Sequence, residues 1–279
     1  MVKKDIEMFL LNKRGYLKKS PLVTAKAIWK VSPKKLLPKT HSQIEKELSL
    51  IKEVQTNLRL AKDFVYTEKQ QDLHDAYHSL MQELDRPKRK LFFDIETTPN
   101  IVYSWRIGRD ISLTHDNIIK ERAIICICYK WSDENETKSL SWSKGNDKEM
   151  LKTFAKIINS ADEIVGQNSD RFDVKWLRAR CLYHRIPLSV KFNSIDTLKM
   201  AKAGFYFNSN KLDYMGQFLG VGKKIHTDYE LWKEVMDGDR EALSKMIEYC
   251  IEDVELLERV YNEIQPYCPE KKFRYKTLN

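Results

Sequence analysis

From residue 90 onward, three strand-like runs come first, and helical and strand-like patterns then alternate. The strand-like runs, rich in apolar and β-branched or aromatic residues, occupy residues 90–95, 123–131 and 138–142. Apolar spacing then predicts helices over 147–159, 173–184 and 240–264, and short strands over 163–166 and 191–194. This order of elements predicts an α/β fold in which helices pack against a mixed sheet.

The first part of the chain has a different texture. Prolines interrupt residues 1–40, and apolar spacing typical of helices recurs over 42–64 and 67–84. We expect a small all-α domain there, compatible with a helix-turn-helix, and a charged, proline-containing hinge after it. The chain thus divides into a basic helical domain, a sheet domain and a short basic tail: 1–87, 88–265 and 266–279.

The positive charge of the chain is confined to its beginning. The formal net charge is +9, and residues 1–40 alone carry eleven Lys and Arg against two acids. A localised basic segment attracts a polyanion, most often nucleic acid, although a solvated, solubilising face has the same composition. We take four lysines as candidate phosphate contacts: Lys18, Lys19, Lys26 and Lys30.

Several classes of protein are excluded by what the sequence lacks. No run of eighteen apolar residues occurs, so we expect no membrane partner. The N-terminal apolar patch is too short for a signal peptide, which predicts a cytoplasmic protein, bacterial or phage-encoded within a host. Five scattered cysteines form no disulfide framework. Cys126 and Cys128 would share one strand face as buried thiols, and without a second close pair we expect no zinc.

Two acids stand two residues apart at the end of the first strand. Asp94 and Glu96 follow the apolar run 91–93 and project to the same face if the strand continues. Adjacent carboxylates repel unless a cation lies between them, and hard oxygen ligands suit Mg²⁺ or Mn²⁺. The alternative is an acid pair that only begins the turn at residues 97–100.

A third acid stands where a helix follows a buried strand. The strand over 163–166 ends in a polar loop, and Asp173 begins the next helix. Ligand sites of α/β proteins collect at such strand ends, and the helix dipole favours a negative group there. An ordinary first-turn aspartate gives the same pattern.

The last long helix carries a fourth acid on an apolar face. Tyr249 and Asp253 are four residues apart and share the face of Met246, Cys250 and Leu257. A carboxylate on such a face requires a partner when it is buried. An exposed aspartate beside a stacked tyrosine is the alternative.

Taken together and in this order, these residues resemble the DEDD superfamily of 3′-to-5′ exonucleases, which have the RNase H-like fold. The matching residues are Asp94 and Glu96, then Asn168, Phe172 and Asp173, then Tyr249 and Asp253. Tyrosine four residues before the last acid is typical of the tyrosine branch, which includes the proofreading domains of family B DNA polymerases. The resemblance spans residues 88–265 and implies a mixed five-stranded sheet flanked by helices; Asp196 falls in a further segment similar to the family, without an assigned catalytic role.

The resemblance implies a two-metal exonuclease with two Mg²⁺ or Mn²⁺ ions. Asp94 would bridge both ions, Glu96 and Asp253 would hold the ion that activates water, and Asp173 would support the other. Tyr249 would orient the attacking water rather than act as a strong base, because free tyrosine titrates near pH 10. Asn168 and Phe172 would contact the substrate, with Tyr103 and Trp105 as weaker stacking candidates.

The resemblance implies hydrolysis of nucleic acid from its 3′ end, with DNA expected over RNA. A separate polymerase or a replication or repair protein is the expected protein partner, because a chain of 279 residues has no room for its own polymerase. The alternative is a non-catalytic nucleic-acid-binding or regulatory protein that has the same scaffold.

Overall fold

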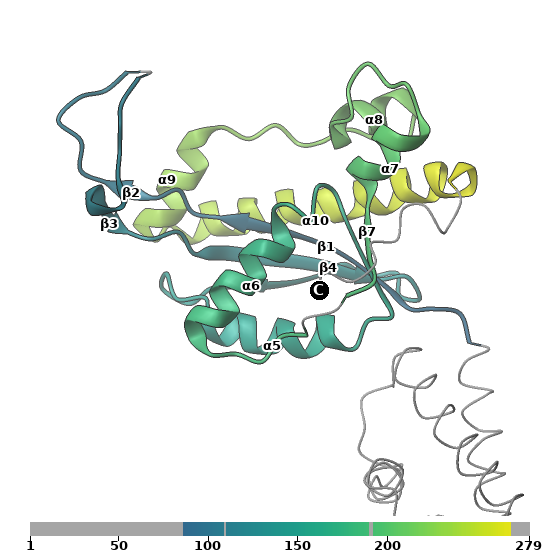
Figure 1. Ribbon diagram of the computed structural model, residues 1–279, viewed down its shortest axis with the longest axis horizontal. Helices are drawn as coiled ribbons and strands as arrows, with labels where there is room; N and C mark the ends of the chain where they lie inside the picture. The colour runs from purple at the N-terminus through teal and green to yellow at the C-terminus, as the bar shows by residue number, and fades with distance from the viewer. Residues whose placement is uncertain (1–85, 109, 190–191, 269–279) are drawn as a thin grey trace, which may run out of the picture. The chain divides into compact units, whose positions relative to one another are not determined.

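A five-stranded mixed sheet forms the centre of the domain that begins at Arg89 (Figure 1). A computed structural model of the chain describes residues 86–108, 110–189 and 192–268. The strand order is β5-β4-β1-β6-β7, in which β5, β4 and β1 are antiparallel neighbours and β6 and β7 run parallel to β1. The strands are β1 (Lys90–Thr97), β4 (Ile124–Trp131), β5 (Lys138–Ser141), β6 (Glu163–Gly166) and β7 (Ser194–Asp196). The predicted mixed five-stranded α/β sheet is confirmed, whereas the predicted N-terminal helical domain lies outside the described residues.

The two central strands are apolar because both of their faces are covered. In β1, Leu91 and Phe93 face one side of the sheet and Phe92 faces the other, and all three are fully buried. Seven of the eight residues of β4 are buried. Burying one such aromatic side chain stabilises the fold by about 2–3 kcal/mol, so these strands anchor the site that β1 carries.

Helices cover both faces of the sheet (Figure 1). α5 (Lys148–Asn159) and α6 (Asp173–His184) pack on the Phe93 face, where Phe154 of α5 lies 5.8 Å from the Phe93 ring. α10 (Arg240–Ile264) packs on the opposite face, where Tyr261 contacts the Phe92 ring edge-on at 5.4 Å. Among the described residues, no helix is both long and apolar enough to cross a membrane.

Three smaller helices pack with α10 in the same layer: α7 (Thr197–Gly204), α8 (Leu212–Phe218) and α9 (Tyr229–Asp237). The described residues also form 3-10 turns at η1 (His115–Asn117) and η2 (Gln265–Tyr267). An arm formed by β2 (Ile101–Val102) and β3 (Ile118–Lys120) projects from the end of β1 (Figure 1). The strand predicted at 191–194 is wrong in position, because pairing of Ile164 with Ser194 places β7 at Ser194–Asp196.

A close contact at the end of β6 sets the path of the loop that leads into α6. A Cβ atom on Gly166 would lie 2.5 Å from Ser169 Cβ and 2.8 Å from its Oγ. Ser169 is fully buried, and its carbonyl accepts a hydrogen bond from Val174 N at 2.9 Å. Only glycine at position 166 therefore allows Ser169 to hold the first turn of α6 in place.

We expect Gly166→Ala to destabilise the protein by about 1–3 kcal/mol, because Ser169 Cβ is fixed to the backbone and cannot move aside. Urea denaturation of the full chain measures this. Gly204→Ala is the matched control, since its new methyl group would lie 3.4 Å from Cys268 Sγ, near an ordinary contact distance. Equal stability of both variants would contradict the proposed role of the close contact.

Candidate metal centre

β1 presents two carboxylates on the face that α10 covers. Asp94 and Glu96 are two residues apart and therefore point the same way as Phe92. In the antiparallel register they lie opposite Cys128 and Cys126 of β4. Both side chains are partly buried, so they lie at the rim of the core rather than in open solvent.

α10 brings a third carboxylate to this pair. Asp253 is 2% exposed and lies one helical turn beyond Tyr249. Carboxylate oxygens of Asp94, Glu96 and Asp253 all lie within 4.8 Å of one another. We call these three residues the carboxylate cluster. Strand period and helix period thus place acids from two distant segments at one point above the sheet.

Asp173 lies beside the carboxylate cluster at the start of α6. It is 3% exposed, and the backbone N–H groups of Asp173 itself and of Ile95 in β1 lower its pKa, so the carboxylate lies close to the strand between the two acids of β1. Oδ1 of Asp173 and Oδ1 of Asp253 are both buried without a hydrogen-bond partner. Buried oxygens of this kind are free to accept a ligand, which is the property expected of metal-binding carboxylates.

Burial and mutual repulsion raise the pKa values of these acids. Burial raises the pKa of Asp94 well above its usual value, and the charges of Asp173 and Glu96 raise it further. Burial and the neighbouring Asp253 raise the pKa of Glu96 to about 8. Burial raises the pKa of Asp173 to about 7, although the nearby backbone N–H groups of Asp173 and Ile95 lower it. Protons or a cation must therefore offset the charge of the cluster at neutral pH.

A lysine already offsets part of that charge. Lys224, in the loop between α8 and α9, places Nζ 2.6 Å from Oδ2 of Asp253 and donates a hydrogen bond to Tyr249 Oη at 3.2 Å. Burial lowers the pKa of Lys224, but the adjacent Asp253 raises it more, so the ammonium stays charged. Sequence reasoning missed this residue, because nothing in a non-periodic loop distinguishes one lysine among 49 Lys and Arg.

The tyrosine of α10 is held from two sides. Trp232 of α9 contacts the Tyr249 ring edge-on at 6.5 Å, and the indole Nε1 of Trp232 donates to Thr97 O at 3.1 Å. The nearby Tyr249 hydroxyl also lowers the pKa of Asp253. Burial raises the pKa of Tyr249, so the phenol is neutral at physiological pH. It can orient a water molecule and cannot act as a strong base.

The loop between β6 and α6 carries the two predicted substrate residues. Asn168 has a left-handed backbone (φ +59), which asparagine tolerates, and its N–H donates to Oδ1 of Asp196 at 2.9 Å. Asp196 also caps α7, so this acid holds the loop in place and is not a member of the carboxylate cluster. Phe172, next to Asp173, is 37% exposed and touches Trp176 with its ring edge.

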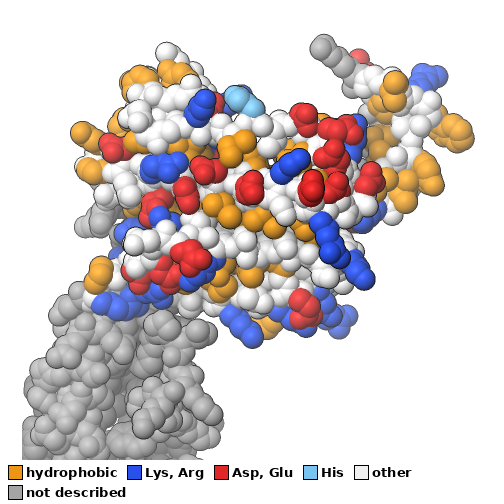
Figure 2. All heavy atoms as spheres, turned by 180° about the vertical axis from the view of Figure 1, so that it is seen from behind, with side chains coloured by type: hydrophobic (Ala, Val, Ile, Leu, Met, Phe, Trp, Pro, Cys, Tyr) orange, Lys and Arg blue, Asp and Glu red, His pale blue; other side chains and the backbone are white. Residues whose placement is uncertain are grey.

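The other predicted contact residues lie elsewhere. Tyr103 and Trp105 are 76% and 103% exposed on the β2–β3 arm, where hydrophobic side chains gather at one side of the molecule (Figure 2). The structure does not place these two rings in the carboxylate cluster. Four predicted phosphate contacts lie outside the described residues: Lys18, Lys19, Lys26 and Lys30.

Comparison with known families agrees with this architecture. A family model described as the RNase H superfamily matches residues 116–265, which include Asp173 and Asp253. The chain belongs to the RNase H superfamily. The matched segment begins after β1 and therefore does not include Asp94 and Glu96. These two acids belong to the same sheet, because β1 lies between β4 and β6 of the matched segment.

A solved structure shows the same fold. The family B DNA polymerase from the hyperthermophilic archaeon Pyrobaculum calidifontis is 20% identical, with a TM-score of 0.50 over 65% of this chain. The likeness covers 25% of the polymerase chain, so this RNase H superfamily protein spans about a quarter of that polymerase. At this identity the likeness establishes a shared fold alone. No curated protein sequence matches the chain.

The donor set of the cluster fits a hard divalent cation. Three carboxylates lie within 4.8 Å of one another, two buried oxygens have no hydrogen-bond partner, and the carboxyl pKa values are raised. Bound Mg²⁺ or Mn²⁺ would stabilise the charged form of these carboxylates. Asp94, Glu96 and Asp253 would supply the ligands, and Asp173 is adjacent to them. The preference for a hard cation follows from the oxygen ligands, because the fold alone specifies no metal.

In buffer that contains EDTA, we expect the melting temperature to fall as pH rises from about 5 to about 9. The pKa values of Glu96 (about 8) and Asp173 (about 7) lie above their unfolded values near 4, so the folded state binds more protons in this window and loses stability as pH rises. Saturating Mg²⁺ should remove most of the fall. Thermal denaturation at a series of pH values measures both effects.

Glu96→Gln is the control for this pH series. It removes one of the two acids whose raised pKa generates the slope, so its melting temperature should depend less on pH and on Mg²⁺. A wild-type melting temperature that is independent of both pH and Mg²⁺ would show that the acids do not form an uncompensated cluster.

Proposed function

We propose that the protein is a divalent-metal-dependent 3′-to-5′ exonuclease of the DEDD tyrosine branch that hydrolyses nucleic acid, with DNA preferred over RNA. Membership in the RNase H superfamily favours a hydrolytic nuclease. One observation carries the proposal: Asp94, Glu96 and Asp253 converge from β1 and α10 beside Asp173 of α6. These are the acids that the resemblance to the exonucleases assigns to metal binding.

The residues at the cluster would have separate roles in binding the metal, orienting water and contacting the substrate. Asp94, Glu96 and Asp253 would hold divalent cations, with Asp173 in support. When bound, such cations lower the pKa of water and offset the charge of the phosphodiester. Tyr249 would orient the attacking water through its neutral hydroxyl. Lys224 would release Asp253 when a cation arrives and then face the phosphate, since its ammonium already lies at the cluster.

Substrate contacts would come from two places. Phe172 is exposed beside Asp173, where a terminal base could stack on its ring. The described sheet domain has nearly balanced charge, and acidic and basic side chains are interspersed on its surface (Figure 2). The basic segment at residues 1–40 would therefore supply the phosphate affinity that the sheet domain lacks.

A partner polymerase is part of the same proposal. The fold is similar to about a quarter of a family B DNA polymerase chain, and this likeness supports a polymerase as the protein partner. We base the direction of cleavage and the preference for DNA on the resemblance to the exonucleases.

One observation favours a second candidate, a non-catalytic nucleic-acid-binding protein. The ion pair between Lys224 and Asp253 offsets part of the negative charge of the carboxylate cluster without a metal. A scaffold that had lost catalysis would benefit from such an internal cation. It would bind nucleic acid in EDTA and in Mg²⁺ alike, and it would release no nucleotides.

We expect Asp94→Asn to lower the rate of digestion of end-labelled DNA by about a hundredfold or more, because it removes a charged metal ligand at the centre of the cluster. Time courses with 5′-labelled DNA and RNA, in Mg²⁺ and in EDTA, measure the rate, the polarity and the substrate preference. Glu252→Gln is the matched control, since it removes the acid next to Asp253 on α10. Digestion of DNA by Asp94→Asn at the wild-type rate would rule out the assigned site.

We also expect the N-terminal lysines to set the salt dependence of DNA binding. Replacing Lys18, Lys19, Lys26 and Lys30 with alanine should reduce the slope of log K against log [salt] by about three, since each phosphate contact contributes about 0.7–0.9. Fluorescence anisotropy of the full chain measures the slope. The control replaces four exposed lysines on α5 and α6 with alanine: Lys148, Lys152, Lys156 and Lys175. Equal slopes for both quadruple variants would contradict the tether.

A further inference from the structure

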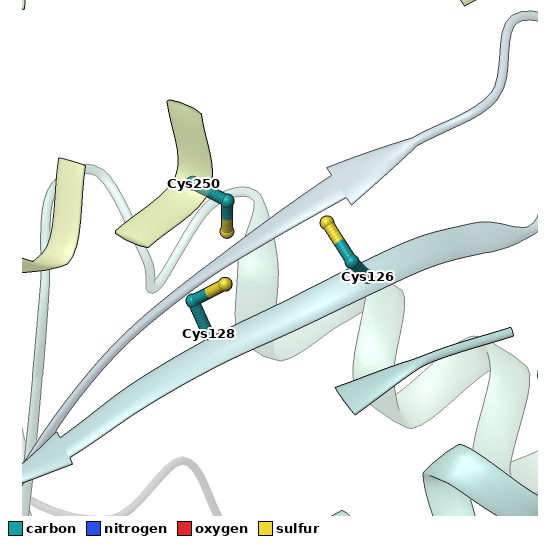
Figure 3. Close-up of side chains that lie close together, drawn as sticks. All are labelled: Cys126, Cys128 and Cys250. Carbon is teal, nitrogen blue, oxygen red and sulfur yellow. The ribbon is translucent and has the colours of Figure 1, made fainter. Parts of the chain in front are cut away.

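Three cysteines meet directly behind the carboxylate cluster. Cys126 and Cys128 project from β4, and Cys250 projects from α10, with the three sulfur atoms turned toward one another (Figure 3). All three Sγ atoms lie within 4.8 Å of one another, and all three residues are fully buried. We call these residues the thiol cluster. The sequence-based expectation of no zinc considered only neighbours in sequence and missed the third thiol.

The thiol cluster and the carboxylate cluster are built on the same positions of the sheet. Cys128 lies opposite Asp94 and Cys126 lies opposite Glu96 in the antiparallel register, so all four side chains share one face. Cys250 lies one residue after Tyr249 and three before Asp253 on α10. Its Sγ lies 3.6 Å from the carbonyl oxygen of Asp94 and 3.8 Å from Oδ2 of Asp94. A change in the thiol cluster therefore acts directly on a proposed metal ligand.

The thiols have few other partners. Besides the contacts of Cys250 with Asp94, Cys128 donates to Ile247 O at 3.7 Å. Simple core packing would also bury three thiols, and metal binding by the thiols distinguishes the two alternatives. A tetrahedral ion with metal–sulfur bonds of about 2.3 Å holds its sulfurs about 3.8 Å apart, so sulfur atoms within 4.8 Å of one another need to approach by at most about 1 Å. Three thiolates select thiophilic ions over Mg²⁺.

A fourth ligand is available from the carboxylate cluster. Structural zinc has four ligands, and aspartate oxygen is among those that zinc accepts. Oδ2 of Asp94 is the carboxylate oxygen that contacts Cys250, and Asp94 is partly exposed, which gives an ion a route from solvent. The other two cysteines, Cys181 and Cys268, lie outside this group.

We propose that Cys126, Cys128 and Cys250 bind one thiophilic divalent cation of the Zn²⁺ class, with Asp94 as the fourth ligand. Binding releases one proton from each of the three thiols and no other product. Occupancy takes Asp94 away from the hard-metal site and so inhibits hydrolysis. The site itself stands on the cysteine geometry, whereas inhibition rests on the proposed nuclease function.

The site is tested on reduced, full-length protein that has been freed of thiophilic metals and placed in excess Mg²⁺. The protein is then titrated with Cd²⁺ as the spectroscopic probe. We expect thiolate-to-cadmium charge-transfer absorption that saturates at one equivalent and is reversed by Zn²⁺. Cys250→Ala should weaken Cd²⁺ binding at least tenfold, and the matched core variant Cys181→Ala should leave it unchanged. Asp94→Ala should retain the absorption and weaken the affinity by about tenfold.

Wild-type protein that shows no thiolate absorption at one equivalent of Cd²⁺ overturns the site, whatever the stability of the variants. Equal loss in Cys181→Ala and Cys250→Ala overturns it too. Unchanged affinity in Asp94→Ala overturns the fourth ligand.

Inhibition is tested with the same variants. Each is compared with its own zinc-free rate: one equivalent of Zn²⁺ should slow DNA digestion at least tenfold in wild type and Cys181→Ala, but not in Cys250→Ala. Zinc inhibition that is the same in all three proteins overturns the coupling. If wild type digests no nucleic acid, the nuclease function and its regulation fail, while the Cd²⁺ titration still decides the thiol site.

Discussion

Repulsion among buried acids is the interaction on which the rest of this structure depends. Asp94, Glu96 and Asp253 lie within 4.8 Å of one another in a poorly solvated position, with Asp173 beside them. Such an arrangement is unfavourable in the absence of a cation, and only a rigid scaffold maintains it. The apolar strands β1 and β4 and the helix α10 provide that scaffold. The ion pair of Lys224 with Asp253 offsets part of the repulsion.

The parts of the fold and site that could be predicted are those set by local periodicity. Alternation along β1 placed Asp94 and Glu96 on one face, and the helical repeat placed Asp253 with Tyr249. These relations depend only on backbone geometry. The mixed sheet followed from the order of the elements, and its five strands were implied by the resemblance to the exonucleases. The functional roles of these residues stay predictions, since placement alone does not measure chemistry.

The parts that could not be predicted depend on tertiary packing. Lys224 comes from a loop without a period, and Cys250 reaches Cys126 and Cys128 only because α10 lies across β4. The position of β7 was misjudged for a related reason, because pairing with β6 rather than the apolar content of 191–194 decides where that strand lies. The N-terminal predictions concern residues outside the described part of the chain.

The central claim is that acids from β1 and α10 share bound divalent ions. Anomalous diffraction from crystals soaked in Mn²⁺ tests it most directly, because it locates the metal without relying on activity. We predict anomalous density between Asp94, Glu96 and Asp253, with the ammonium of Lys224 displaced from Asp253. Mn²⁺ density found only at other positions, with the Lys224 ion pair intact, would contradict the claim.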